Sequence, residues 1–197
     1  EAASRVGGRC WSLRGFFPGQ VAERGGEFID TSHSAMRGYA RAFGLQLEDV
    51  SKGPGELFYN FDGRNVPEAQ VVEEFRAFVD AIRPDMSKLG YPTADSYSEF
   101  DRSLDLMPLD QYLASRGAGA LLRQVIEVAY TIEYGLSASQ LSAIAFLRFI
   151  HADKRSKFTP FGVFSDERFH VVEGNDRIAS GIAARRPRPP QLATRRV

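Results

Sequence analysis

The hydrophobic pattern changes twice along the chain, and this change limits the folds that the chain can adopt. Both ends carry short apolar runs among glycines, a pattern typical of strands and turns. Between them, apolar residues recur every three or four positions, and residues 68–83 predict the clearest amphipathic helix, which Pro84 is expected to end. The pattern predicts an α+β or α/β fold in which the two ends form one lobe and a mainly helical segment is inserted between them.

Local signals predict further elements. The Asp62–Gly63 pair lies between apolar runs and favours a tight hairpin turn, because glycine accepts a positive φ. Thr31 and Ser32 are N-cap residue types before a helix expected over residues 33–43. The other expected elements are a strand at 10–13, helices beginning near Ser98, Pro108, Leu121 and Ser137 or Ser139, with Asp105 or a neighbour capping the second of these, a strand at 169–172, a helix after Asp176 and a strand from Leu192.

Composition excludes several classes of protein. The length of 197 residues and the hydrophobic fraction of 43% suit one or two globular domains. The formal net charge is +0, so no overall field attracts nucleic acid or a membrane surface, and no apolar run reaches the roughly 20 residues of a membrane helix. A single cysteine, Cys10, cannot form an internal disulfide and fits a reducing compartment. We therefore expect a cytoplasmic protein without nucleic-acid or membrane partners.

Several conspicuous side chains have ordinary explanations. The three histidines and Cys10 lack metal-binding spacing, so no metal site is predicted. Cys10 is expected to be buried, and Trp11 is expected in a core or an interface, although it could stack near a cofactor. Helical spacing favours core packing over a substrate cavity for four aromatic residues: Tyr130, Tyr134, Phe146 and Phe149.

The first nine residues combine an acid, two arginines and a glycine pair. Dinucleotide-binding folds use a carboxylate at the end of a strand to bind ribose hydroxyls, and Glu1 would lie at such a strand end. Gly7 and Gly8 allow the backbone to come close to a phosphate, and Arg5 and Arg9 offer positive charge. From the residues alone, a solvated turn explains the glycine pair equally well.

Three segments carry a resemblance to a known family. Residues 1–9 (EAASRVGGR) match an E-A-x-x-R-x-G-G-R run, and residues 23–29 (ERGGEFI) match an E-x-G-G segment a short way downstream. Residues 169–178 (FHVVEGNDRI) are similar to a V-x-G-G-x-x-x-L segment. Together these segments resemble the flavin-containing amine oxidases, which include monoamine, polyamine and L-amino-acid oxidases, and the resemblance spans nearly the whole chain.

The resemblance implies FAD as the cofactor and roles for the first motif. Glu1 would bind the adenosine ribose. Gly7, Gly8 and Arg9 would lie along the pyrophosphate and the isoalloxazine side. Arg5 would contact the phosphate region or buttress the loop.

Two further segments would reach the cofactor. Gly25, Gly26 and Glu27 would approach the flavin ring. Val197 would lie where a strand backbone meets adenine in the family. The resemblance assigns no catalytic residue within this chain.

The resemblance also implies a domain organisation and an activity. We expect an incomplete FAD-binding Rossmann-like domain in residues 1–55 and 166–197, with a mainly helical substrate-domain insertion in residues 56–165. The complete protein would oxidise an amine or amino acid to an imine by hydride transfer to flavin. The alternative is a non-catalytic helical binding or assembly module derived from such an enzyme. The sequence does not identify the amine. It leaves open the related desaturase and protoporphyrinogen oxidase branches and the possibility of a homo-oligomer.

The chain departs from the family pattern at two points. The G-x-G-x-x-G turn that supplies the main diphosphate contact is expected about twenty residues before Glu1 and does not occur here. The chain alone is therefore expected to be an internal fragment that binds FAD weakly and is inactive. Glu173, Gly174 and Asn175 stand where a double glycine is usual.

Overall fold

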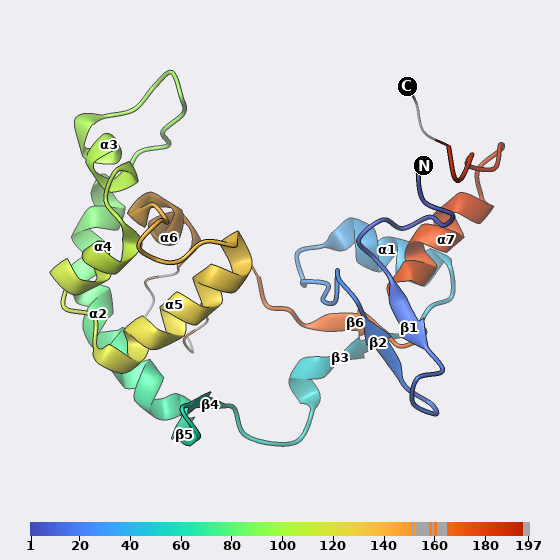
Figure 1. The fold of residues 1–197 in the computed structure, drawn as a ribbon, viewed down its shortest axis with the longest axis horizontal. Coiled ribbons are helices and arrows are strands. Elements are labelled where there is room, and N and C mark those ends of the chain that lie inside the picture. Colours follow the sequence, from blue (N-terminus) through green and yellow to red (C-terminus); the bar gives the residue numbers. More distant parts are fainter. Residues whose placement is uncertain (151, 153–157, 159, 161–164, 195–197) are drawn as a thin grey trace. The chain divides into compact units, whose positions relative to one another are not determined.

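A computed structural model describes residues 1–150, 152, 158, 160 and 165–194. These residues form mixed α and β structure, as predicted (Figure 1). The chain divides into a terminal unit, made of Glu1–Pro54 and Phe164–Val197, and a helical unit, Gly55–Val163. Among the described residues, no helix is both long and apolar enough to cross a membrane.

The terminal unit joins segments from the two ends of the chain. Strand β1 pairs antiparallel with β2, β3 pairs antiparallel with β6, and an isolated bridge joins Ile29 to Phe169. Segments that lie 120 to 140 residues apart in the sequence therefore fold together. Its described elements are β1 (Ser12–Arg14), β2 (Val21–Glu23), α1 (Ser34–Ala42), β3 (Leu47–Asp49), the short 3-10 helix η1 (Val50–Lys52), β6 (Phe169–Val171) and α7 (Asp176–Ala184).

A small apolar core holds the terminal unit together. Helices α1 and α7 pack closely because Gly181 has no side chain, and a Cβ there would overlap the Phe43 ring. The fully buried apolar residues of this core are Ile29, Ala40, Val171 and Ile178. With so few buried side chains, the unit also depends on polar contacts between its segments.

The helical unit begins with the predicted hairpin. Strands β4 and β5 are joined by Asp62 and Gly63, whose φ angles of 50° and 77° are those of the expected tight turn. The elements of this unit are β4 (Phe58–Phe61), β5 (Arg64–Pro67), α2 (Glu68–Lys88), α3 (Glu99–Asp105), α4 (Leu109–Ser115), α5 (Ala120–Tyr134) and α6 (Ala143–Phe149).

Helices α2 and α5 build the larger core of the helical unit. The buried face of α2 carries the apolar residues expected from its periodicity, including Val71, Phe75 and Ile82. Glu74 on α2 accepts a hydrogen bond from the Leu122 backbone N–H at 2.7 Å, which satisfies one of the open donors at the start of α5. One side chain thus fixes the end of one helix against the middle of another.

The expected end of α2 at Pro84 is wrong. The helix continues to Lys88, with Pro84 inside its last turns. Pro84 lies on the exposed face of the helix, away from the packed core. Beyond Pro84, the buried Asp85 accepts hydrogen bonds from Tyr112 and Arg116, and these contacts hold the last turn in place.

The predicted start of α6 and the predicted cap of α4 are also wrong. Helix α6 begins after Ser142, whose hydroxyl caps the Ile144 N–H at 3.2 Å, and not after Ser137 or Ser139. Asp105 does not cap α4; its carboxylate instead accepts a hydrogen bond from the Ser142 hydroxyl at 3.0 Å. Ser142 caps α6 locally, but its hydroxyl also binds Asp105, which is 37 residues away, and local patterns do not contain that contact.

Candidate functional site

The loop before β1 turns at positions 7 and 8, where the backbone conformation favours glycine. Gly7 and Gly8 have φ angles of 102° and 53°, and the Cys10 N–H donates to the Gly7 carbonyl at 2.8 Å. A Cβ on Gly7 would lie 2.8 Å from the Cys10 carbonyl oxygen. The glycine pair therefore makes a tight loop with exposed backbone at Gly8.

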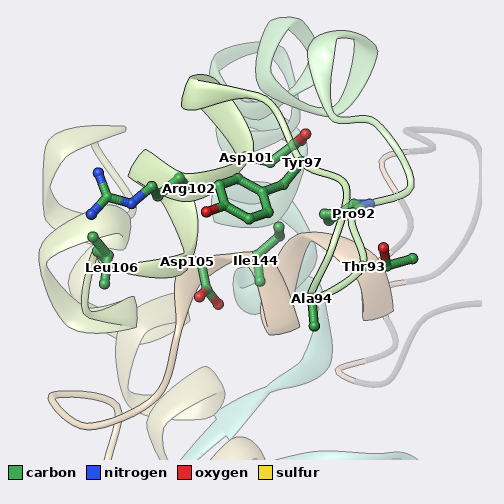
Figure 2. A pocket seen from close by; sticks show the side chains of 9 residues that line it. All are labelled: Pro92, Thr93, Ala94, Tyr97, Asp101, Arg102, Asp105, Leu106 and Ile144. Carbon is green, nitrogen blue, oxygen red and sulfur yellow. The ribbon is translucent and has the colours of Figure 1, made fainter.

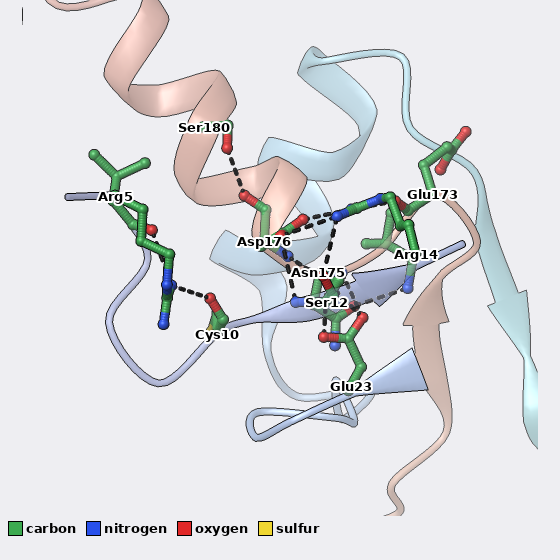
Figure 3. A network of polar contacts seen from close by, with 11 residues as sticks. Arg5, Cys10, Ser12, Arg14, Glu23, Glu173, Asn175, Asp176 and Ser180 are labelled. Carbon is green, nitrogen blue, oxygen red and sulfur yellow. Dashed lines mark hydrogen bonds and ion pairs between the residues drawn. The ribbon is translucent and has the colours of Figure 1, made fainter. Parts of the chain in front are cut away.

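Arg5 braces this glycine loop from within. Its guanidinium donates to the carbonyls of Val6 and Cys10 at 3.1 Å each and of Gly8 at 2.6 Å (Figure 3). This geometry matches the buttressing role that the resemblance offers for Arg5. Arg9, the other arginine of the run, is exposed.

The second glycine pair packs against the first loop. A Cβ on Gly25, whose φ is 154°, would lie 2.6 Å from the Arg9 carbonyl oxygen. A Cβ on Gly26 would lie 3.0 Å from the Cys10 sulfur. Two motifs that are about 15 residues apart in the sequence are thus in direct contact because their glycines lack side chains.

A surface hollow of about 590 Å³ lies where these two loops meet. It is lined by Gly7, Arg9, Cys10, Arg24, Gly25 and Gly26. Glycine backbone and two cationic side chains suit the approach of an anionic, phosphate-bearing group, so this part of the chain fits an FAD molecule. The expected burial of Cys10 is wrong, because Cys10 is half-buried and faces the hollow.

Arg24 and Trp11 belong to this region although the sequence patterns did not assign them to the site. The Trp11 ring contacts two guanidiniums, and its centroid lies 4.6 Å from the guanidinium of Arg5 and 4.3 Å from that of Arg24. Trp11 is 39% exposed, so a core role for it is wrong. The position of Arg24 directly before Gly25 was the available signal for a second cation.

Glu1 lies beside the C-terminal segment. Its carboxylate accepts a hydrogen bond from the Ala3 N–H at 3.0 Å, and this bond holds the pKa of Glu1 below its ordinary value. Ala193 and Thr194 donate backbone hydrogen bonds to the carbonyls of Ala3 and Glu1, at 2.9 and 3.0 Å. The described part of the strand expected from Leu192 is irregular, although it runs alongside the first residues.

The last two predicted site residues are Glu27 and Val197. Glu27 is exposed and directly follows the second glycine pair. Val197 lies outside the described residues.

The third motif is fastened to β1 by an arginine. Arg14 binds both carboxylate oxygens of Asp176, at 2.5 and 3.1 Å, and donates to the Glu173 carbonyl (Figure 3). The hydrogen bonds with Arg14 lower the pKa of Asp176, and those with Asp176 raise the pKa of Arg14. The start of α7 is therefore held against β1.

A second hollow, of about 470 Å³, lies within the helical unit between α3 and α6 (Figure 2). The Tyr97 ring is among its lining side chains, and its charged groups already bond within the fold. Asp101 forms the α3 capping box with Ser98, Arg102 lies 3.9 Å from Glu99, and Asp105 binds Ser142. We therefore place no catalytic group there.

Three of the four aromatic residues predicted to pack in the core do so, whereas Tyr134 is 40% exposed. Tyr130 and Phe146 are buried with ring centroids 5.5 Å apart, and Phe149 packs against the same core. Burial raises the pKa of Tyr130 far above its ordinary value. Among the residues that the structure describes, no group of three or more His, Cys, Asp or Glu side chains could hold a metal ion.

Solved structures of amine oxidases share this fold. Cyclohexylamine oxidase from Brevibacterium oxydans IH-35A superposes with a TM-score of 0.72 at 21% identity, over 93% of this chain and 42% of that one. Putrescine oxidase bound to putrescine superposes with a TM-score of 0.61 at 18% identity, again over 93% and 42%. At these identities the similarity shows the fold alone, and this chain spans less than half the length of these relatives. A search of curated proteins found no match.

The family comparison covers almost the whole chain. The model of the flavin-containing amine oxidoreductases matches residues 1–196, which include all three motifs described above. The chain belongs to the flavin-containing amine oxidoreductase family.

Proposed function

We propose that the complete protein is an FAD-dependent amine oxidase, in which the terminal unit binds the cofactor and the helical unit forms part of the substrate domain. Family membership implies FAD in the complete protein. The observation that carries the proposal within this chain is the hollow between the two glycine loops, lined by Arg9 and Arg24. If the Gly7–Gly8 pair were only a solvated turn, the close contact between Gly25 and the Arg9 backbone would have no purpose.

The residues of the hollow would divide the work of binding. Arg9 and Arg24 would offset the negative charge of the pyrophosphate or of the reduced flavin. Gly7 and Gly25 would let the two loops pack together beside the cofactor, because a Cβ at either position would collide with loop backbone. Glu1 would accept hydrogen bonds from the ribose hydroxyls. Arg5 would keep the loop in shape without binding the cofactor itself.

Bound FAD would accept a hydride from the carbon beside the amine, leaving an imine that water hydrolyses. The relatives named above are oxidases of cyclohexylamine and putrescine, which supports an amine as the substrate class. No described side chain of this chain is assigned a proton-transfer step.

The test uses the complete protein that contains this chain. After removal of free flavin, its visible spectrum should show bound FAD, and anaerobic addition of cyclohexylamine or putrescine should bleach that spectrum. A protein that folds, retains no flavin and takes up none on titration would overturn the proposal and favour the non-catalytic binding or assembly module.

Arg9→Ala tests the site within the complete protein. A charge-assisted hydrogen bond is worth roughly 1.5–3 kcal/mol, so FAD affinity should fall by about one to two orders of magnitude. The melting temperature of the flavin-free protein should not change, because Arg9 is exposed. Arg186→Ala removes an equally exposed arginine of the same unit, away from the hollow, and should leave FAD affinity at the parental value. Equal affinities for the two variants would remove Arg9 from the site.

A further inference from the structure

Asn175 is a buried polar side chain that ties the third motif to the second glycine pair. Its side-chain N–H groups donate to the carbonyls of Gly26, at 2.7 Å, and Glu27, at 2.5 Å. Its side-chain oxygen accepts the Val171 backbone N–H at 2.9 Å. Asn175 is only 2% exposed, so water cannot replace these bonds without opening the unit.

The hydrogen bonds determine how the Asn175 amide is oriented. Both of its donors face carbonyl oxygens and its acceptor faces an N–H group, so a flipped amide would place like groups against each other. The Asn175 backbone N–H also donates to the Glu23 carboxylate at 2.9 Å, and this carboxylate accepts the Ser12 hydroxyl. The residue is therefore held in one position by its own backbone as well.

The contacts of Asn175 fix two peptide groups that would otherwise be free to rotate. Gly26 has a φ of 53°, and glycine reaches alternative conformations readily. All peptide bonds described here are trans, so an N–H group points opposite to the carbonyl of the same peptide. With the carbonyls of Gly26 and Glu27 bound to Asn175, the N–H groups of Glu27 and Phe28 point to the other side of the loop.

We propose that Asn175 is a positioning residue for the cofactor: it holds the loop around Gly26 in the conformation that receives the flavin ring. The inference rests on the function proposed above, because it requires that this loop lies at the flavin. The N–H groups of this loop would donate hydrogen bonds to the isoalloxazine ring, whose carbonyl oxygens and ring nitrogens are acceptors. Asn175 stands where the family pattern usually has the second of two glycines. A glycine there would have no side chain with which to hold the loop around Gly26.

Asn175→Asp in the complete protein is the informative variant. It keeps the size of the side chain and the acceptor for Val171, but it replaces both donors with an oxygen that faces two carbonyls. FAD affinity should fall by about tenfold or more, and the reduction potential and visible spectrum of the flavin that still binds should shift. In the flavin-free protein, amide hydrogen exchange in residues 26–29 should become faster. Asn175→Ala, which introduces no charge, should change the same quantities in the same direction and serves if the aspartate variant fails to fold.

Arg14→Gln is the matched control. It loosens the same segment from β1, because it removes the contacts to Asp176 and Glu173, but leaves the Asn175 amide intact. Its melting temperature should fall, while FAD affinity, flavin potential and exchange at residues 26–29 should stay at the parental values. A purely structural role for Asn175 would make the two variants behave alike.

The outcomes separate the two proposals. If Arg9→Ala weakens FAD binding while both Asn175 variants keep the parental affinity and flavin potential, the positioning role is wrong and the proposed function stands. If the parent protein binds no flavin, the proposed function falls, and the positioning role falls with it. The expected result is weak binding in the Arg9 and Asn175 variants and parental binding in Arg14→Gln.

Discussion

At the scale of single residues, the Asp85 carboxylate is a buried acid that two hydrogen bonds hold in place. It is buried and accepts hydrogen bonds from the Tyr112 hydroxyl at 2.7 Å and Arg116 Nε at 2.6 Å. Burial alone would raise the pKa of Asp85, but the bonds from Arg116 and Tyr112 outweigh it and hold the pKa below its ordinary value. The ionised form of Asp85 therefore stabilises the folded unit.

Asp85→Ala should lower the free energy of unfolding of the helical unit by about 2–3 kcal/mol, because it leaves two donors without their acceptor. Urea unfolding followed by far-UV circular dichroism measures this loss. Arg83→Gln breaks an ion pair whose partners are both more than half exposed, and it should change stability by less than about 0.5 kcal/mol. Similar losses in the two variants would contradict the role given to Asp85.

The same variant has a defined pH dependence. A folded-state pKa below the unfolded one gives stability that is present above the unfolded value, about 3.9, and that is lost as the pH falls through the folded value. The difference in stability between the parent and Asp85→Ala should therefore be full at neutral pH and shrink on acidification below about pH 4. A difference that stays constant with pH would show that packing and not charge holds Asp85.

The site residues show what single positions reveal in a sequence. Gly7, Gly25 and Arg9 were predictable, because glycine pairs beside arginines have a direct physical meaning at a phosphate. Arg24 carried a weaker signal, since a charged residue beside a glycine is common. Asn175 was recognisable only as a departure from the family pattern, because its role depends on carbonyls about 150 residues away.

At the scale of elements, α2 shows where local rules fail. Apolar periodicity predicted its start and its buried face, but Pro84 does not end it. A proline in a helix loses one hydrogen bond and crowds the preceding turn, and here the contacts of Asp85 beyond it outweigh that penalty. The hairpin at Asp62 and Gly63 was predictable because its turn is determined by adjacent residues. The start of α6 was not, because its cap belongs to a contact with a distant segment.

Pro84→Ala should stabilise the helical unit. Alanine supplies the backbone N–H group that proline lacks and relieves the crowding of the preceding turn. In a helix interior, these two effects make proline less favourable than alanine by about 3 kcal/mol. The proline also restricts the unfolded chain, which offsets about 0.4–1 kcal/mol of this gain. We expect a net increase of about 2 kcal/mol in the free energy of unfolding, measured by urea titration. A loss of stability would mean that Pro84 favours the geometry of the last turn.

At the scale of the whole molecule, the two units have separate cores and different spectroscopic signals. The single tryptophan, Trp11, lies in the terminal unit, whereas α2 to α6 supply most of the helical signal. The core of the terminal unit is small, so each buried side chain carries a large share of its stability. Ile178 and Leu122 are both buried apolar residues, one in each core.

Ile178→Ala should act on the terminal unit. Truncating a buried isoleucine or leucine to alanine reduces stability by about 2–5 kcal/mol. The urea transition reported by Trp11 fluorescence should move to a lower concentration, because Ile178 lies in the core of the same unit as Trp11. The transition reported by far-UV circular dichroism should move little. Leu122→Ala should give the reverse pattern, a shift in circular dichroism with little change in fluorescence. If either substitution moved both transitions together, the two units would unfold as one cooperative body, and the prediction that they unfold independently would be wrong.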